Sequence, residues 1–159
     1  MTLAGVIATW FGSGRLPGAP GTWGSLAALP CAALLVWLGG WPLLLIASLA
    51  VFAIGVWASE RHARMLRKKD PGEIVVDEVA GQWLVLLPLP LDPLAYLLGF
   101  IAFRAFDIAK PWPVSLADRA VGGGLGIMLD DIVAAAYALA ACSLLAFLTG
   151  WPYVLYRVL

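Results

Sequence analysis

Two pairs of adjacent acidic residues are the part of this chain best suited to chemistry. Asp77-Glu78 and Asp130-Asp131 each come directly before an uncharged apolar segment, and Asp107 lies between the pairs. Mg²⁺ prefers hard oxygen ligands, usually one or two carboxylates, with water and substrate phosphate completing the octahedron. The alternative is helix capping, because acids in a first helical turn stabilise a helix by about 0.3–1 kcal/mol. Two pairs together with Asp107 favour a metal site over capping alone.

A stripe of mixed charge is expected on one helix after Phe103. Arg104, Asp107 and Lys110 are spaced at i, i+3 and i+6, which places them within about 120° of one another around a helix. This spacing suits an internal salt bridge. It also suits a phosphate clamp, with arginine as the bidentate donor and lysine as the point charge, while Asp107 binds metal or serves as nucleophile or base. The prolines that follow Lys110 are expected to end the helix.

Two glycine-rich segments are candidates for contact with a phosphate. Residues 21–25 (GTWGS) precede the first long apolar run, and residues 122–126 (GGGLG) precede Asp130. Glycine lets backbone amides approach an anion, and a helix N-terminus favours negative charge. We expect Thr22 or Ser25 to cap the first long helix. Turns and close helix packing are the alternative roles, and neither segment is a P-loop because no Gly-Lys-Ser/Thr follows.

The remaining reactive side chains point to no second kind of chemistry. His62, the only histidine, lies within a basic run and is expected to be solvated or interfacial, which argues against a phosphohistidine intermediate. No Ser/His/Asp set can be assembled around it. Cys31 and Cys142 lie in apolar runs without a His or Cys at ligand spacing, so we expect small hydrophobic side chains in helices rather than a disulfide or metal site.

The elements that must position these residues belong to a membrane protein. Hydrophobic residues make up 62 % of the 159 residues, against about 45–50 % in soluble domains, and the mean hydropathy is +0.92. The formal net charge is zero, so no global basic surface favours nucleic acid as a partner. The length is that of one domain, and we treat residues 1–159 as a single membrane domain with no oligomeric state predicted.

The first long apolar stretch predicts a helical hairpin. Residues 16–59 carry no charge and are interrupted near the middle by Gly39-Gly40-Trp41-Pro42. A membrane span needs about 20 predominantly apolar residues, so the stretch accommodates two spans joined by a tight turn. The first span is expected to begin near Gly21.

The later apolar stretches are of unequal length. Residues 79–91 and 93–103 would each be only about 17–20 Å long as helices, against a hydrocarbon core of about 30 Å. They predict a re-entrant hairpin or shallow spans around a turn at Asp92. Residues 132–156 predict a final span with interfacial aromatic residues at its far end.

The charge distribution places the acidic residues on one side of the membrane. Ten of the 20 charged residues lie between Glu60 and Glu78, and seven lie between Arg104 and Asp131. The basic run at 61–69 follows a span directly, and short loops rich in Lys and Arg stay on the cytoplasmic side. The hairpin before this run, and the return of the chain at Asp92, then bring Arg15 and both acidic pairs to the cytoplasmic face.

Four segments together resemble the phosphatidylglycerophosphatase A family. They are GSGRLPGAPGTWGS at 12–25, DPGEIVVDEVAG at 70–81, FRAFDIAKPWP at 103–113 and DRAVGGGLGIMLDD at 118–131, so the resemblance covers nearly the whole chain. It implies an enzyme of the bacterial cytoplasmic (inner) membrane that hydrolyses the terminal phosphate of phosphatidylglycerophosphate. The products would be phosphatidylglycerol and phosphate, with Mg²⁺ as cofactor and the membrane phospholipid as substrate.

The resemblance also implies roles for the residues singled out above. The metal ligands would be Asp77, Glu78, Asp107, Asp130 and Asp131. The catalytic carboxylates would be among these, namely Glu78, Asp107 and Asp131. Substrate contacts would come from Arg104, Lys110, Thr22 and Ser25.

Two other classes of membrane protein combine acids with spans. A CDP-alcohol phosphotransferase-like enzyme also uses Mg²⁺, but its spaced acidic motif is absent here. A small ion channel or transporter would use intramembrane acids for passage, whereas these acids lie at span ends. We therefore predict an all-α integral membrane helical bundle with short or re-entrant helices and an acidic, phosphatase centre at its cytoplasmic face.

Overall fold

Helices form all the regular structure in the residues that the computed structural model describes, which are 2–110, 112 and 121–150. In chain order these elements are α1 (Leu3–Ala8), the 3₁₀ turn η1 (Ser13–Arg15), α2 (Pro20–Leu66), α3 (Val76–Leu86), α4 (Pro93–Ala109) and α6 (Gly123–Thr149). No strand occurs in this part of the chain. The prediction of an all-helical fold is confirmed.

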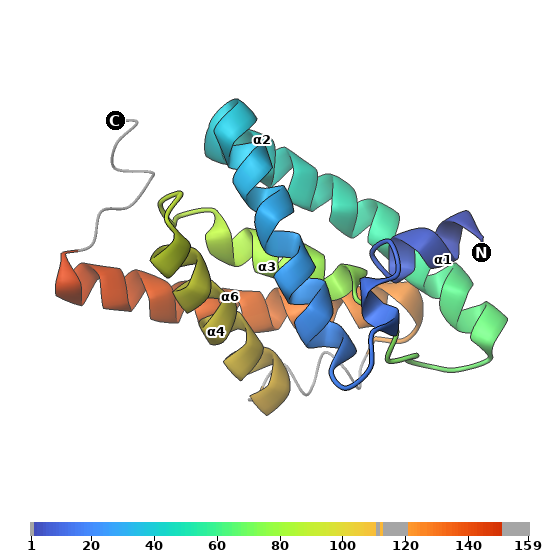
Figure 1. Ribbon diagram of the computed structural model, residues 1–159. Coiled ribbons are helices and arrows are strands. Elements are labelled where there is room, and N and C mark those ends of the chain that lie inside the picture. Colours follow the sequence, from blue (N-terminus) through green and yellow to red (C-terminus); the bar gives the residue numbers. More distant parts are fainter. Residues whose placement is uncertain (1, 111, 113–120, 151–159) are drawn as a thin grey trace.

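α2 is a helical hairpin rather than one continuous rod. Gly39 and Gly40 leave the helical region inside it, with φ/ψ values of −152°/18° and 66°/−167°. The positive φ of Gly40 suits glycine, which has no Cβ to clash. Figure 1 shows the two arms of α2 meeting at this break and diverging from it. The predicted pair of helices joined at Gly39-Gly40 is confirmed.

The start of α2 differs from the expectation in one respect. The helix begins at Pro20, whose missing N–H leaves one donor fewer to satisfy in the first turn, and no side chain caps this end. Thr22 and Ser25 both lie inside the helix and do not cap it. The prediction of a side-chain cap there is wrong, and the unpaired amides of this end remain available to another acceptor.

α3 and α4 are the two short helices expected around Asp92. The Asp92 carboxylate accepts hydrogen bonds from the backbone N–H groups of Leu94 (2.9 Å) and Ala95 (3.0 Å), so it caps α4, and Pro93 follows in the first turn. α3 has 11 residues and α4 has 17, and both fall short of the about 20 that a span needs. Among the described residues, α2 and α6 are the helices long and apolar enough to cross a membrane.

α6 begins at Gly123, well before Ile132, where the apolar pattern predicts the start of the last span. The acidic pair Asp130-Asp131 interrupts the apolar pattern but not the helix, because both side chains are buried against other helices. Sequence hydropathy therefore misplaces this boundary. The predicted interfacial aromatic residues beyond Gly150 lie outside the described residues.

α3 forms the buried centre of the bundle and packs against α2, α4 and α6. Nine of its 11 residues are buried. Gly81 lets α3 lie close to α4 and α6. A Cβ at this position would lie 2.7 Å from the Phe103 ring and 3.0 Å from the carbonyl oxygen of Asp131. The Trp83 indole donates a 2.9 Å hydrogen bond to the carbonyl of Ala28, which ties α3 to the first arm of α2. α3 is thus held at the junction of the three longer helices.

The outer faces of α2 and α6 carry large apolar side chains that nothing in the described chain covers. Trp37 and Leu38 on α2 are 73 % and 61 % exposed, and Phe147 and Leu148 on α6 are 79 % and 71 % exposed. Apolar exposure on this scale marks a surface that meets lipid or another protein. On both helices it occurs within a stretch long enough to span a bilayer, which favours lipid.

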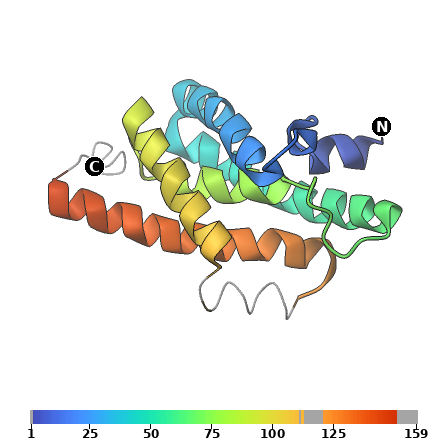
Figure 2. The same cartoon turned by 60° about the horizontal axis from the view of Figure 1, so that its bottom comes forward.

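The turns and helix ends of the bundle lie on two opposite sides of the molecule. In Figures 1 and 2 the Gly39-Gly40 turn of α2 and the start of α4 lie toward one side of the molecule, while the beginning of α2 and the end of α4 lie toward the other. Asp107, which lies near the end of α4, is therefore on this second side.

Candidate active site

Three helices bring the five predicted acids together. α3 carries Asp77 and Glu78 in its first turn, α4 carries Asp107 near its end, and α6 carries Asp130 and Asp131. Their oxygens form two sets, one of Asp77, Asp130 and Asp131 and one of Glu78, Asp107 and Asp131. Within each set, one oxygen per residue lies within 4.8 Å of the others. We call these five residues the acidic centre.

The acidic centre is almost closed to solvent. The side chains of Glu78 and Asp107 are 13 % and 11 % exposed, and Asp131 is 3 % exposed. Burial raises the pKa of Asp77 well above its usual range and raises that of Glu78 to about 7, because an ionised carboxylate loses its hydration and gains like-charged neighbours. Positive charge among these side chains would remove that penalty.

Two basic side chains already lie against the acids. The Arg104 guanidinium forms an ion pair with Asp107, and its Nη1 lies 3.7 Å from Glu78 Oε1. Lys110 Nζ donates a 2.6 Å hydrogen bond to Asp130 Oδ2. The internal salt bridge predicted from spacing therefore exists between Arg104 and Asp107, whereas Lys110 ends α4 with a φ of 40° and reaches across to α6. Both cations stand where they could also meet a phosphate.

The fit of the acidic centre to a metal ion can be judged from its unpaired atoms. Asp77 Oδ1, Glu78 Oε2 and Asp131 Oδ2 are buried and have no hydrogen-bond partner in the described part of the chain. Buried polar atoms are seldom left without a partner. A hard divalent cation with oxygen ligands supplies what all three lack. The residues present therefore fit the expected Mg²⁺.

The first turn of α2 borders the acidic centre. A Cβ on Gly21 would lie 2.1 Å from Glu78 Oε1 and 2.9 Å from Arg104 Nη1, so the absence of a side chain makes room for both groups. Thr22 is half-buried beside it, and Ser25 is fully buried one turn further on, where its hydroxyl has no partner among the described residues. The roles of Thr22 and Ser25 in substrate binding stay predictions.

Capping does not explain both acidic pairs. Asp77 and Glu78 do lie in the first turn of α3, where the helix dipole favours them. Asp130 and Asp131 lie about two turns inside α6, beyond the reach of its dipole. What the two pairs share is the space between the helices.

Comparison with known proteins identifies the family. The family model for phosphatidylglycerophosphatase A matches residues 6–146. The chain belongs to the phosphatidylglycerophosphatase A family. It is 43 % identical over 130 residues to phosphatidylglycerophosphatase A of Escherichia coli (strain K12), covering 81 % of this chain and 75 % of the relative. No solved structure matches it.

Two further relatives extend the comparison. Phosphatidylglycerophosphatase A of Haemophilus influenzae (strain Rd) is 39 % identical over 134 residues, covering 84 % of this chain and 82 % of the relative. A putative phosphatidylinositol-3-phosphatase of Bacteroides thetaiotaomicron is 38 % identical over 146 residues, covering 84 % and 87 %. Family membership makes this chain a phosphoric monoester hydrolase, as its motifs predict. The phosphotransferase and channel alternatives gain no support from these relatives.

In this family member the glycine-rich segment at 122–126 serves helix packing. The backbone N–H of Gly124 donates a 2.6 Å hydrogen bond to Glu60 Oε2, and a Cβ on Gly124 would lie 2.0 Å from the carbonyl oxygen of Val56. The segment thus brings the start of α6 directly against the second arm of α2. The close-packing alternative accounts for Gly124.

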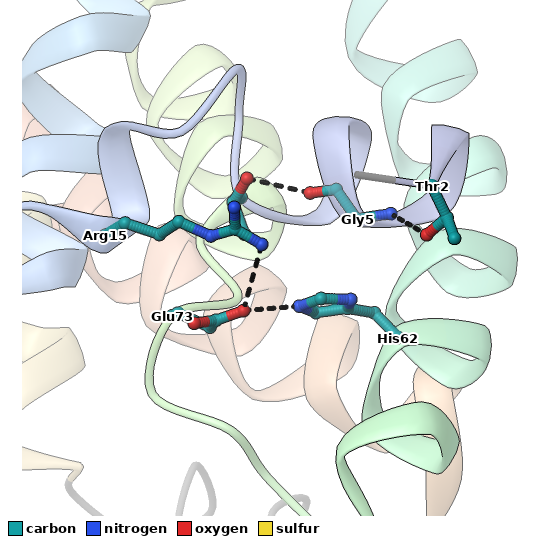
Figure 3. A network of polar contacts seen from close by, with 6 residues as sticks. Thr2, Gly5, Arg15, His62 and Glu73 are labelled. Carbon is teal, nitrogen blue, oxygen red and sulfur yellow. Dashed lines mark hydrogen bonds and ion pairs between the residues drawn. The ribbon is translucent and has the colours of Figure 1, made fainter.

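A second polar network, which the sequence does not predict, lies beside α1 (Figure 3). The His62 imidazole donates from Nε2 to Glu73 Oε1 at 2.6 Å, and Arg15 Nη2 lies 3.5 Å from the same oxygen. The His62 side chain is only 4 % exposed, because α1 covers it at Gly5. The expectation that His62 is solvated or interfacial is therefore wrong. The basic residues of the run face solvent, but His62 faces the interior.

This network holds the chain that leads into α3. Glu73 lies four residues before Asp77, and the backbone N–H of Val75 donates a 2.9 Å hydrogen bond to the carbonyl of Ala8. The hydrogen bond from His62, assisted by the charge of Arg15, lowers the pKa of Glu73. The signal in the sequence is Glu73 itself, an acid that lies in the same segment as the pair Asp77-Glu78.

Proposed function

We propose that this chain is a Mg²⁺-dependent lipid phosphatase that hydrolyses phosphatidylglycerophosphate to phosphatidylglycerol and phosphate. The observation that carries the proposal is the convergence of five acids and two bases from α3, α4 and α6 on one nearly closed site. Two relatives at 39–43 % identity bear the name of this activity.

The basic side chains and the start of α2 would receive the phosphate group. Arg104 offers a planar set of donors that suits two phosphate oxygens, and Lys110, with 35 % of its side chain exposed, offers a point charge at the open edge. The start of α2 is the positive end of a helix with uncapped amides, and it lies next to Arg104, where Gly21 leaves room. A phosphomonoester dianion is the ligand this arrangement suits.

The acids would hold the cofactor and move the proton. When bound, Mg²⁺ neutralises phosphate oxygens and makes phosphorus more open to attack. Either water attacks phosphorus directly, or a carboxylate attacks first and water then hydrolyses the resulting acyl phosphate to release phosphate. In both routes the bond to the glycerol oxygen breaks as that oxygen takes up a proton. One of Glu78, Asp107 and Asp131, which lie together, would accept the proton of water or attack directly.

The membrane would present the substrate to this site. We place the enzyme in the bacterial cytoplasmic membrane as a multi-pass protein whose acidic centre faces the cytoplasm. The exposed apolar faces of α2 and α6 support the insertion, and the basic run at 61–69 supports the orientation. A phosphorylated headgroup at the bilayer surface could then reach the centre while its acyl chains stay in lipid.

A phosphate-release assay with purified protein tests the proposal. Phosphatidylglycerophosphate in mixed micelles should release phosphate with Mg²⁺ and stop when EDTA is added. Phosphatidylinositol 3-phosphate is the matched competitor substrate, because a relative at 38 % identity is named for a phosphatase of that lipid. Preference for phosphatidylinositol 3-phosphate would reassign the headgroup. No release from either lipid with any divalent ion would overturn the phosphatase assignment.

A further inference from the structure

We infer that the acidic centre binds two divalent cations, which share Asp131 as a common ligand. This inference rests on the proposed function and deepens it by stating how many ions the site takes and which residues hold each. One ion would be held by Asp77, Asp130 and Asp131, and the other by Glu78, Asp107 and Asp131.

The arrangement of the oxygens is the first argument. Each set spans three side chains whose oxygens lie within 4.8 Å of one another, close to the separation that ligands of one small cation adopt. Asp131 is the single member common to both sets. A carboxylate has two oxygens, and paired metal ions in phosphate-transferring enzymes stand about 3.5–4 Å apart, a distance that one carboxylate can bridge.

The unpaired atoms are the second argument. Asp131 is 3 % exposed, yet its Oδ2 has no hydrogen-bond partner among the described residues, and Asp131 belongs to both sets. Each set also contains another unpaired oxygen, Asp77 Oδ1 in the first and Glu78 Oε2 in the second. One ion would satisfy one set and leave an unpaired buried oxygen in the other.

Charge balance is the third argument. Five ionised carboxylates against the two cations bonded to them leave the centre three charges negative. One divalent ion would leave it negative still, and a phosphomonoester dianion would be repelled. Two ions make it positive by one charge. Each set moreover has its own basic neighbour, Lys110 beside the first and Arg104 beside the second.

Binding of Mn²⁺, which replaces Mg²⁺ at oxygen sites and is paramagnetic, tests the inference without measuring activity. The purified full chain in a neutral detergent is titrated with Mn²⁺, and bound metal is counted while electron paramagnetic resonance spectra are recorded. We expect two Mn²⁺ per chain and a spectrum of exchange-coupled ions. One Mn²⁺ per chain, or two that give only the spectrum of isolated ions, would overturn the inference.

Substitutions assign the ions to their sets. Asp77→Asn and Glu78→Gln should each remove one ion and the coupling, leaving the signal of a single isolated Mn²⁺. Asp131→Asn should abolish the coupling. Asp70→Asn is the matched control, because Asp70 is an exposed acid of the loop before α3, and it should keep both ions and the coupled signal. Full coupling in Asp77→Asn or Glu78→Gln would contradict the assignment, and circular dichroism identifies any variant that fails to fold.

The outcome separates this inference from the proposed function. Phosphate release from lipid by a protein that binds a single Mn²⁺ would support the phosphatase assignment and contradict the inference of a second ion. Two coupled ions in a protein that hydrolyses no lipid phosphate would support the two-ion site and contradict the phosphatase assignment.

Discussion

At the scale of single residues, the proposed function depends on the negative charge of the carboxylates in the acidic centre. Asp107→Asn and Asp130→Asn keep the size of the side chain but remove the charge that would hold a cation. We expect each to lower kcat by about 10²-fold or more, with normal membrane insertion. Phosphate release by protein purified from membranes measures this.

The control for these two substitutions is Asp92→Asn. Asp92 caps α4 away from the centre, and asparagine caps a helix about as well as aspartate, so this variant should keep its activity. If Asp92→Asn were as inactive as Asp107→Asn, the loss would reflect folding, and the assignment of the acidic centre would lose its support.

The Glu73 network predicts a particular dependence of stability on pH. The pKa of Glu73 is lowered by the hydrogen bond from His62 and by Arg15, so the folded protein favours the ionised carboxylate. The stabilisation is present above the ordinary pKa of glutamate and is lost as pH falls through the lowered value. Wild type should therefore unfold at a higher temperature than Glu73→Gln at neutral pH, and the difference should shrink in acid.

Thermal unfolding of the two proteins in detergent, measured between neutral and acid pH, checks this. Arg15 is 41 % exposed and contributes little by itself, whereas the buried His62 loses its partner in the variant. A difference in unfolding temperature that stays constant across the pH range would show that Glu73 does not titrate as the network requires.

Much of the acidic centre was predictable from residue type. Buried acids are costly in an apolar chain, so Asp77, Asp107 and Asp130 could be selected without a structure. The surroundings of His62 were not predictable, because the basic residues around it in the sequence are exposed while its own side chain lies beneath α1. Local composition reports the average of a helix surface, and a single position can face the other way.

At the scale of elements, the closeness of α2 to the acidic centre leads to a test at a residue with no side chain. A methyl group on Gly21 would lie 2.1 Å from Glu78 Oε1 and 2.9 Å from Arg104 Nη1, so it must displace one or both. We expect Gly21→Ala to lower kcat/KM by about 10²-fold, since displacement of a positioned group by 1 Å can cost that much. Steady-state kinetics in mixed micelles measure it.

Gly72→Ala is the comparison for Gly21→Ala. A Cβ at Gly72 meets nothing within 4 Å, and this glycine lies in the loop before α3, so the variant should retain full activity. Full activity in Gly21→Ala would mean that the start of α2 does not border the reacting groups.

The elements themselves were predictable to different degrees. The hairpin of α2 follows from Gly39-Gly40 inside an uncharged run, and the turn before α4 follows from Asp92 and the prolines around it. The start of α6 did not follow, because Asp130 and Asp131 interrupt the hydropathy without interrupting the helix. Acids can remain inside an apolar helix when groups on neighbouring helices face them. This depends on tertiary structure, which local hydropathy does not report.

At the scale of the whole molecule, the bundle sets the acidic centre at one end of its apolar body. The acids come from three different helices, and α3 is buried among the others, so the site forms only when the bundle is assembled. The family motifs indicated which residues to consider. Which acids share a set, and that Asp131 belongs to both, depends on distances between helices that no spacing along the chain encodes.

The orientation of this bundle in the membrane is the last prediction. The basic run at 61–69 places that end in the cytoplasm, and the turn near Pro42 should then lie outside. Single cysteines, introduced after replacement of Cys31 and Cys142, report the side through a reagent that does not cross membranes. Pro42→Cys should react in intact cells, whereas Lys68→Cys should react only after lysis.

Ile108 gives the decisive position for the acidic centre. It is 70 % exposed at the end of α4, next to Asp107, so a cysteine there can react and reports the side on which the centre lies. We expect Ile108→Cys to behave like Lys68→Cys. Reaction of Ile108→Cys in intact cells, with Lys68→Cys protected, would mean that α3 and α4 cross the membrane only once. Because the carboxylates of Asp107 and Glu78 lie within 4.8 Å of each other, that pattern would contradict the packing that assembles the acidic centre.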